Sequence, residues 1–336
     1  MPEMNISESE VNALLDKLGA VNTEIGKAIV GQQSVVEELL ISLLAGGHCI
    51  LEGVPGLAKT LMVSTLANTL QLDFRRVQFT PDLMPSDLIG TEILEEDHGT
   101  GKRFFKFQKG PVFTNLLLAD EINRTPPKTQ AALLEVMQER AVSYAGEHYP
   151  LDKPFFVLAT QNPVEQSGTY ALPEAQLDRF LLFIRVAYPS SEEEVEILRR
   201  TTSASTESVM PVLDASDIVA LQGIVRSVAI SDTLLAYAAE IVRATRPGGG
   251  GPNEVQDYVR WGAGPRAGQA LVLCAKAHAV INRRFAVTVD DLHSIAPAAL
   301  RHRLLLNFQA EANGISADDI VAQVLESLPP PTSELM

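Results

Sequence analysis

A short glycine-rich segment between an apolar run and a helical pattern constrains the fold of this chain more than any other feature. The apolar run is HCILE at residues 48–52, and the helical pattern covers residues 60–70. A strand, a glycine turn and a helix in this order open a βαβ unit. Because βαβ units build parallel sheets, the segment predicts an α/β fold.

Further apolar runs in the first half of the chain favour a buried parallel sheet. Each run is short, is rich in β-branched or aromatic residues, and ends at polar residues. Buried parallel strands have this composition because helices cover both faces of the sheet. The runs are residues 74–79, 115–119, 155–159 and 180–186, and helical patterns lie at residues 11–30, 34–44 and 128–140. We therefore predict an α/β domain over residues 1–188.

The second half of the chain predicts a smaller, all-α domain over residues 189–336. Here helical patterns replace the strand-like runs. Ser191 precedes three glutamates, which fits a helix N-cap followed by acids in the first turn. The helical patterns cover residues 192–201, 215–228, 231–245, 265–282 and 288–303.

Two segments of the first half carry hairpin signatures outside the predicted sheet. The first covers residues 91–107, where two strand-like arms flank the turn sequence HGTG. The second covers residues 141–151, with Ala145-Gly146 between arms that contain tyrosine. Both are open to interpretation as plain loops or as contact surfaces. Their length, which reaches past the predicted core, favours contact surfaces.

The glycine-rich segment GVPGLAKT at residues 53–60 has the pattern of a phosphate-binding loop, with Ala58 in place of the usual glycine. Gly53 and Gly56 permit turns that aim backbone N–H groups at a phosphate, and the next helix adds its dipole. Lys59 supplies a cation, and Thr60 supplies a hydroxyl ligand for Mg²⁺. A glycine turn before an ordinary helix is the alternative. The predicted nucleotide-binding residues are Gly53, Val54, Pro55, Gly56, Leu57, Ala58, Lys59, Thr60 and Leu61.

Two acids follow the apolar run at residues 116–119. Asp120 and Glu121 would lie at the carboxyl edge of the sheet, where ligands of parallel sheets bind. We expect Asp120 to hold Mg²⁺ together with Thr60, and Glu121 to polarise the attacking water. Taken alone, the pair is equally typical of two solvated acids at a strand end.

Two further polar residues are candidates for catalysis. Asn162 follows the run at residues 155–159 and could orient the water or touch the γ-phosphate, although an Asn before a proline is also a common cap. Arg179 precedes the last strand of the domain and could stabilise charge in the transition state. An ion pair of Arg179 with Asp178 or Glu174 is an equal alternative.

Charge and cysteine content narrow the class of protein. The chain has 27 Lys and Arg against 42 Asp and Glu, a formal charge of −15, which disfavours broad binding to nucleic acid. Cys49 and Cys274 each lie in an apolar run and are predicted to be buried thiols. No targeting segment and no apolar run of about 20 residues occurs, so we expect a cytoplasmic protein without membrane insertion.

The order and wording of these motifs resemble the MoxR family of AAA+ ATPases. The resemblance extends from about residue 30 to residue 303, and Ala58 fits it as well. It is specific because the long string after Asp120 is hardly required by phosphate chemistry alone. The matching strings are GVPGLAKT at residues 53–60, QFTPDLMP at 78–85, DEINRTPPKTQ at 120–130, TQNP at 160–163 and LPEAQLDRF at 172–180.

The resemblance implies an architecture and an assembly. The fold would be a P-loop ATPase sheet followed by a helical lid, and the copies would form a homo-hexameric ring with ATP and Mg²⁺ at the subunit interfaces. Gly31 and Gln32 would correspond to the segment beside the adenine. The hairpins at residues 91–107 and 141–151 would correspond to the helix-2 and pre-sensor-1 insertions, which face the pore of the ring.

The resemblance also implies roles for individual polar residues. Asn162 would correspond to sensor 1, and Arg179 to an arginine finger that acts on the neighbouring subunit. Arg266, in the sequence GPRA, would correspond to sensor 2 on the lid. Arg124 is a further candidate to reach across the interface.

The function implied by the resemblance is that of a chaperone-like ATPase. Such proteins mature enzymes or complexes, in some cases by inserting a metal cofactor, and commonly act beside partners with a von Willebrand factor A domain. This chain contains no such domain, so its adaptor would be a separate protein. A DNA-linked motor and a slow regulatory nucleotide-binding protein are the alternatives, and a magnesium-chelatase subunit is a near neighbour.

Overall fold

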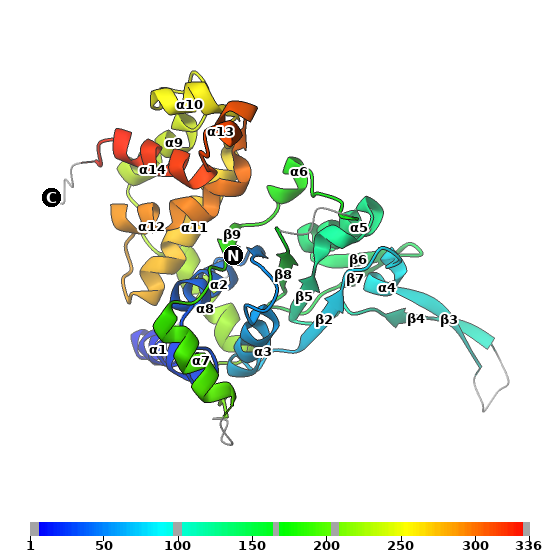
Figure 1. Ribbon diagram of the computed structural model, residues 1–336. Helices are drawn as coiled ribbons and strands as arrows, with labels where there is room; N and C mark the ends of the chain where they lie inside the picture. The colour runs from blue at the N-terminus through cyan, green and yellow to red at the C-terminus, as the bar shows by residue number, and fades with distance from the viewer. Residues whose placement is uncertain (1–6, 97–102, 164–167, 203–207, 332–336) are drawn as a thin grey trace.

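The computed structural model describes residues 7–96, 103–163, 168–202 and 208–331, which form a sheet-centred part and a helical part (Figure 1). Among these residues, five parallel strands form the central sheet in the order β2-β5-β8-β1-β9. The strands are β1 (Cys49–Glu52), β2 (Phe74–Gln78), β5 (Leu116–Asp120), β8 (Phe156–Gln161) and β9 (Leu182–Arg185). The predicted α/β fold is confirmed.

In β1, β5, β8 and β9, alternate side chains enter two different cores, one on each face of the sheet. The edge strand β2 was predicted to be buried but is largely exposed, because only one neighbouring strand covers it. In β5, Leu116 and Leu118 belong to one hydrophobic cluster, whereas Leu117 and Ala119 belong to the other. Covering both faces explains why these four strands are largely apolar runs. The helices of this part are α1 (Glu8–Ala28), α2 (Gln33–Leu44), α3 (Lys59–Thr69), α4 (Pro85–Ile89), α5 (Pro127–Glu139) and α6 (Glu174–Leu177).

The helical part packs on the sheet and shares a hydrophobic core with it. Leu271 and Ile295 of the helical part lie in the same buried cluster as Leu51 of β1. Cys49 and Cys274, predicted to be buried thiols, are buried and unbridged. The elements are α7 (Ser191–Thr201), α8 (Ala215–Ser227), α9 (Asp232–Ala244), α10 (Asn253–Tyr258), β10 (Val259–Trp261), α11 (Pro265–Ile281), α12 (Val289–Leu300), β11 (Leu305–Leu306), α13 (Phe308–Ala312) and α14 (Ala317–Ser327).

The start of α7 corrects the sequence prediction, because Ser190 and not Ser191 is its N-cap. The Ser190 side chain accepts a hydrogen bond from the backbone N–H of Glu193, whose carboxylate accepts one from the Ser190 N–H at 2.7 Å. This reciprocal capping box requires the acid to stand three positions after the cap, with two residues between them. Ser190 meets that spacing with Glu193, and Ser191 is the first helical residue.

The two predicted hairpins are present and are joined by aromatic side chains. The first consists of β3 (Gly90–Glu96) and β4 (Arg103–Lys109) and projects from the molecule (Figure 1), while the turn predicted at residues 98–101 lies outside the described residues. The second consists of β6 (Ala141–Tyr144) and β7 (Glu147–Pro150). Phe107 of β4 stacks on Tyr149 of β7, with ring centroids 4.5 Å apart. The hairpins therefore contact each other at their bases.

Candidate functional site

The glycine-rich loop joins the carboxyl end of β1 to the first turn of α3. Gly56 has φ 89°, a backbone conformation that glycine adopts freely. α3 begins at Lys59, so its free N–H groups point toward the loop. The Lys59 ammonium donates hydrogen bonds to the carbonyl oxygens of Gly53 and, at 3.1 Å, Val54. The loop thus combines backbone donors, a helix N-terminus and a cation, which suits a phosphate.

Ala58 explains why this loop usually carries glycine at the same position. It has φ 52° and ψ 23°, which is the left-handed region. An L-residue with a Cβ atom is disfavoured there by roughly 1–2 kcal/mol. The chain therefore carries local backbone strain immediately before Lys59.

The pKa of Lys59 is lowered, chiefly because partial burial disfavours its charged form. The carboxylates of Asp120, Glu121 and Glu52 act in the opposite sense and favour the ammonium. Three acids around one lysine show that the loop and the strand ends share one electrostatic environment.

Asp120, at the end of β5, is held on both carboxylate oxygens. Its Oδ1 accepts a hydrogen bond of 2.6 Å from Thr160, and its Oδ2 accepts two from the Arg76 guanidinium at 3.0 and 2.6 Å. The sequence did not single out Arg76 or Thr160. Both are polar residues at or near the end of a strand that neighbours β5, Arg76 on β2 and Thr160 on β8. This position is the feature of the sequence that could have identified them.

Glu121 sits in a left-handed turn directly after β5, with φ 59°. Its backbone N–H donates to the Thr160 hydroxyl at 2.9 Å. Its carboxylate accepts a hydrogen bond of 2.5 Å from Gln78 and lies 3.3 Å from the Arg124 guanidinium. Gln78 was also missed, although it pairs in register with Asp120 at the tip of β2.

One cavity of about 370 Å³ brings together the loop and the polar strand ends. Lys59, Thr60, Asp120, Glu121 and Asn162 all line it, as the sequence predicted. The full lining consists of Pro55, Gly56, Leu57, Ala58, Lys59, Thr60, Leu61, Arg76, Asp120, Glu121, Thr160, Gln161 and Asn162. The carboxyl ends of β1, β5 and β8 meet here, as expected for a ligand site of a parallel sheet.

Gly31 and Gln32 lie outside the residues that line this cavity. Both have left-handed backbone conformations, with φ 68° and 59°. The Gln32 side chain donates a hydrogen bond of 2.9 Å to the backbone oxygen of Ala187, just after β9. This contact fixes the segment between α1 and α2 to the end of the sheet.

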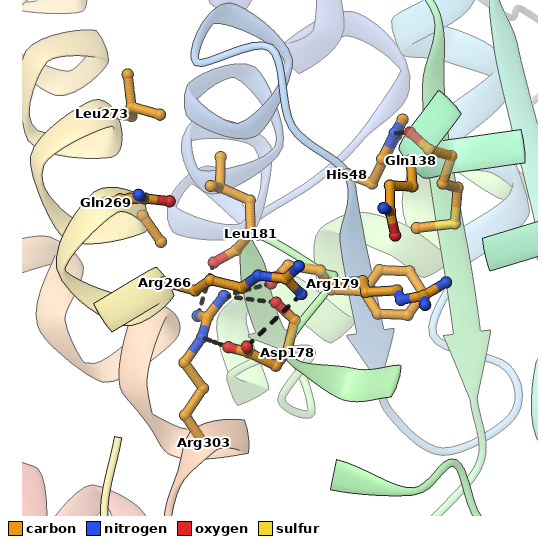
Figure 2. A pocket seen from close by; sticks show the side chains of 12 residues that line it. His48, Gln138, Asp178, Arg179, Leu181, Arg266, Gln269, Leu273 and Arg303 are labelled. Atoms are coloured by element: carbon orange, nitrogen blue, oxygen red, sulfur yellow. Dashed lines mark hydrogen bonds and ion pairs between the residues drawn. The ribbon is translucent and has the colours of Figure 1, made fainter. Parts of the chain in front are cut away.

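Arg179 and Arg266 line a second cavity, of about 210 Å³ (Figure 2), and no residue of the glycine-rich loop is among those that line it. His48 and Leu181 also line it, and they directly precede β1 and β9. The second cavity therefore lies at the amino end of the sheet, and the first lies at the carboxyl end. The four residues of β1 separate them by on the order of 13 Å. Within one chain, the structure does not bring Arg179 or Arg266 to the phosphate loop.

The donor groups at the first cavity fit Mg²⁺ bound together with phosphate. The described residues contain no group of three or more His, Cys, Asp or Glu side chains that could hold a metal by themselves. Mg²⁺ does not need such a group, because it is usually held by one or two carboxylates and by substrate phosphates. Thr60 and Asp120 offer a hydroxyl and a carboxylate to the same cavity.

Across the part of the chain that the structure describes, no helix is both long and apolar enough to span a bilayer.

Comparisons with known proteins agree with this geometry. Residues 48–182 match the model of the ATPase family associated with various cellular activities (AAA), and residues 253–324 match that of the AAA lid domain. A crystal structure of a candidate ATPase from Cytophaga hutchinsonii is 46% identical, with a TM-score of 0.89 and coverage of 97% of this chain and 98% of that one.

Curated relatives identify the family. The chain is 45% identical over 306 residues to "Chaperone MoxR1" of Mycobacterium tuberculosis, which covers 91% of this chain and 80% of the relative. It is 31% identical over 334 residues to "Protein MoxR" of Methylorubrum extorquens, with 94% and 96% covered. With the glycine-rich loop, the two acids at the end of β5 and the lid on one chain, these matches show that it belongs to the MoxR family of AAA+ ATPases.

Proposed function

We propose that this chain hydrolyses MgATP at sites shared between neighbouring copies of itself, and that it uses the energy to remodel or mature a protein partner. The observation that carries the proposal is the separation of the two cavities along one sheet. Lys59 and Glu121 line one cavity, whereas Arg179 and Arg266 line the other. Each chain thus holds two complementary parts of an ATPase site, which a homo-hexameric ring would bring together.

The first cavity would hold the nucleotide and the metal. Backbone N–H groups of the loop and the Lys59 ammonium would bind the phosphates, and Lys59 would exchange its bonds to loop carbonyls for phosphate oxygens. Thr60 and Asp120 would hold Mg²⁺, which when bound neutralises charge on the β- and γ-phosphate oxygens. The residues proposed to bind the nucleotide are those of positions 53–61, with Gly31 and Gln32 beside the adenine.

Glu121 is the proposed general base. It would take a proton from water while the water oxygen bonds to the γ-phosphorus and the bond from that phosphorus to the bridging oxygen breaks, leaving ADP with the electron pair and free phosphate. Asn162 would orient the water or the γ-phosphate from the tip of β8. Gln78 and Arg124 bind the Glu121 carboxylate, so water must compete with these two groups for it.

Arg179 and Arg266 would act on the nucleotide of the neighbouring copy. Both side chains are exposed, and they line one cavity at the amino end of the sheet. Their positive charge is local in a chain of net charge −15, which suits recognition of a triphosphate. Arg124 stands beside Glu121 of its own chain, so Arg179 is the stronger candidate for the finger.

The proposed partner is a protein, in keeping with the relative that is named a chaperone. Leu94 and Phe105 pair on one face of the projecting β3–β4 hairpin and are 55% and 71% exposed. An exposed apolar pair on a projecting element suits contact with an apolar segment of a client. A separate protein with a von Willebrand factor A domain would serve as adaptor, and insertion of a metal cofactor is one form that maturation would take.

Assembly dependence of turnover tests the proposal. Monomers contain no complete site, so turnover per chain should rise with protein concentration as rings form. Lys59→Ala should abolish ATP binding measured by calorimetry. Turnover per chain that stays constant while ultracentrifugation shows monomers converting to rings would contradict the shared site. Undiminished ATP binding by Lys59→Ala would contradict the assignment of the loop. Salt-sensitive DNA binding in a gel shift would instead favour a DNA-linked motor.

A further inference from the structure

Asp178 lies among the three arginines of the second cavity (Figure 2). Its Oδ1 accepts a hydrogen bond of 2.7 Å from Nε of Arg303, and its Oδ2 lies 3.9 Å from the Arg266 guanidinium. Arg179 is the next residue in the chain, and its side chain extends away from the carboxylate (Figure 2). One acid therefore connects the segment that carries Arg179 to two arginines of the helical part.

Arg303 differs from the other two arginines because its guanidinium is buried and fully engaged. Its side chain is only 4% exposed, against 54% for Arg266. Besides Asp178 Oδ1, it donates to the backbone oxygens of Asp178 at 3.3 Å, Phe180 at 2.7 Å and Leu181 at 3.2 Å, and to that of Ala299 in the preceding helix α12. The backbone on both sides of Arg179 is thus fixed to the helical part by one side chain.

The contact of Asp178 with Arg266 is of a different kind. The two groups are 3.9 Å apart and partly exposed, a geometry in which an ion pair contributes little to stability. Such a contact orients the Arg266 side chain, but a stronger anion can displace Asp178 from it. A phosphate that entered the cavity would therefore recruit Arg266 easily, whereas Arg303 would keep its bonds to the backbone.

We infer that Asp178 and Arg303 are positioning residues for the trans-acting arginines. Arg303 fixes the segment of Arg179 to the helical part, and Asp178 keeps Arg266 near Arg179 until the phosphates of the neighbouring copy arrive. This inference rests on the proposed function, in which Arg179 and Arg266 act on that neighbour. The ion pair between Asp178 of the sheet-centred part and Arg303 of the helical part would therefore align the arginines at the interface.

A subunit-mixing experiment tests the inference. Asp178→Ala leaves the phosphate loop of its own chain intact, so it should keep the KM for ATP within about twofold and lower kcat roughly 10- to 100-fold, as misplaced catalytic groups do. Lys59→Ala subunits lack nucleotide binding but retain their arginines. Rings that mix the two variants should regain turnover, because Lys59→Ala subunits supply aligned arginines to the intact loops of Asp178→Ala subunits.

Matched variants separate the possible outcomes. Arg179→Ala mixed with Lys59→Ala should also regain turnover, and its failure to do so would overturn the trans arrangement itself. If that mixture recovers, two results would contradict the positioning role. One is a wild-type kcat for Asp178→Ala alone, and the other is no recovery when Asp178→Ala is mixed with Lys59→Ala. Asp178→Asn keeps an acceptor for Arg303, so it should lose less kcat than Arg303→Lys; the reverse order would also overturn the inference. Asp152→Ala, a change of another exposed acid, should have no effect.

Discussion

The two ends of the central sheet carry polar sites of opposite construction. At the carboxyl end, Asp120 and Glu121 are held by residues at or near the tips of adjacent strands, such as Thr160 and Gln78. At the amino end, Asp178 is held by Arg303, which lies 125 residues further along the chain. The first site follows from strand order alone. The second exists only because the helical part packs against the sheet, so the alignment of its arginines depends on that packing.

The largest effect that would sharpen this comparison is expected for Arg179→Ala. The change removes charge stabilisation from the neighbouring site and should lower kcat by about 10³- to 10⁵-fold. ATP affinity should stay near the wild-type value, because the phosphate loop lies at the other end of the sheet. Steady-state kinetics and calorimetry measure the two quantities. Arg243→Ala, on the exposed surface of α9, is the control, and unaltered kcat in Arg179→Ala would remove the finger assignment.

A change at the carboxyl end should affect chemistry in the chain that carries it. Glu121→Gln keeps the hydrogen-bonding shape but cannot accept a proton, so kcat should fall by about 10²- to 10⁴-fold while ATP remains bound. Retention of unhydrolysed ATP after gel filtration checks this expectation. Glu139→Gln, at the exposed end of α5, should hydrolyse normally. Rapid hydrolysis by Glu121→Gln would show that another group is the base.

Acid should weaken the amino end of the sheet in particular, because buried neutral histidines lie there. Burial lowers the pKa of His48 from 6.5 to about 4, and the pKa of His302 is also lowered well below its usual value. Between pH 6.5 and 4 these histidines bind more protons in the unfolded chain than in the folded one, so their contribution to the free energy of unfolding decreases as pH falls. Burial raises the pKa of Glu38 to about 7, which acts in the opposite sense, so a comparison with a histidine variant is needed to isolate this contribution. His48 alone should account for about 3 kcal/mol across this range.

Urea denaturation at pH 7 and pH 4.5 measures this loss. His48→Gln removes the titrating ring, so on going from pH 7 to pH 4.5 its free energy of unfolding should fall by about 3 kcal/mol less than that of the wild type. His148→Gln, on the exposed β7 strand, should leave the pH dependence unchanged. Equal pH dependence in the wild type and His48→Gln would show that His48 does not contribute.

The smallest effect is expected within the phosphate loop. Ala58→Gly relieves the left-handed backbone strain, so it should stabilise the fold by up to about 1 kcal/mol and leave ATP affinity unchanged. Ala131→Gly makes the same chemical change on the exposed face of α5 and should destabilise by about 1 kcal/mol. Thermal denaturation compares the two variants. If Ala58→Gly loses as much stability as Ala131→Gly, the backbone of Ala58 is not strained.

The sequence predicted the carboxyl-end site well, because apolar runs that end in polar residues mark the strand tips. Thr60, Asp120 and Asn162 were expected there and line one cavity. Gln78 and Arg76 were missed because the order of the strands cannot be read from one sequence, and only adjacency of β2 to β5 gives these residues a role. The contact between Asp178 and Arg303 was missed because one sequence does not show which elements pack together, and these two residues are 125 positions apart. Periodicity located the helix that ends near Arg303, but not what that helix packs against.

The stacked pair of Phe107 and Tyr149 has a mechanical consequence. β6 follows α5 after a single residue, and α5 begins shortly after Glu121, so the second hairpin is connected by a stiff helix to the acid. The aromatic contact adds the first hairpin to this connection. A force applied to the projecting hairpin would therefore be shared with the second hairpin, and through it with α5. If the chain hydrolyses ATP as proposed, load on the hairpins would be linked through α5 to the residue that activates the water.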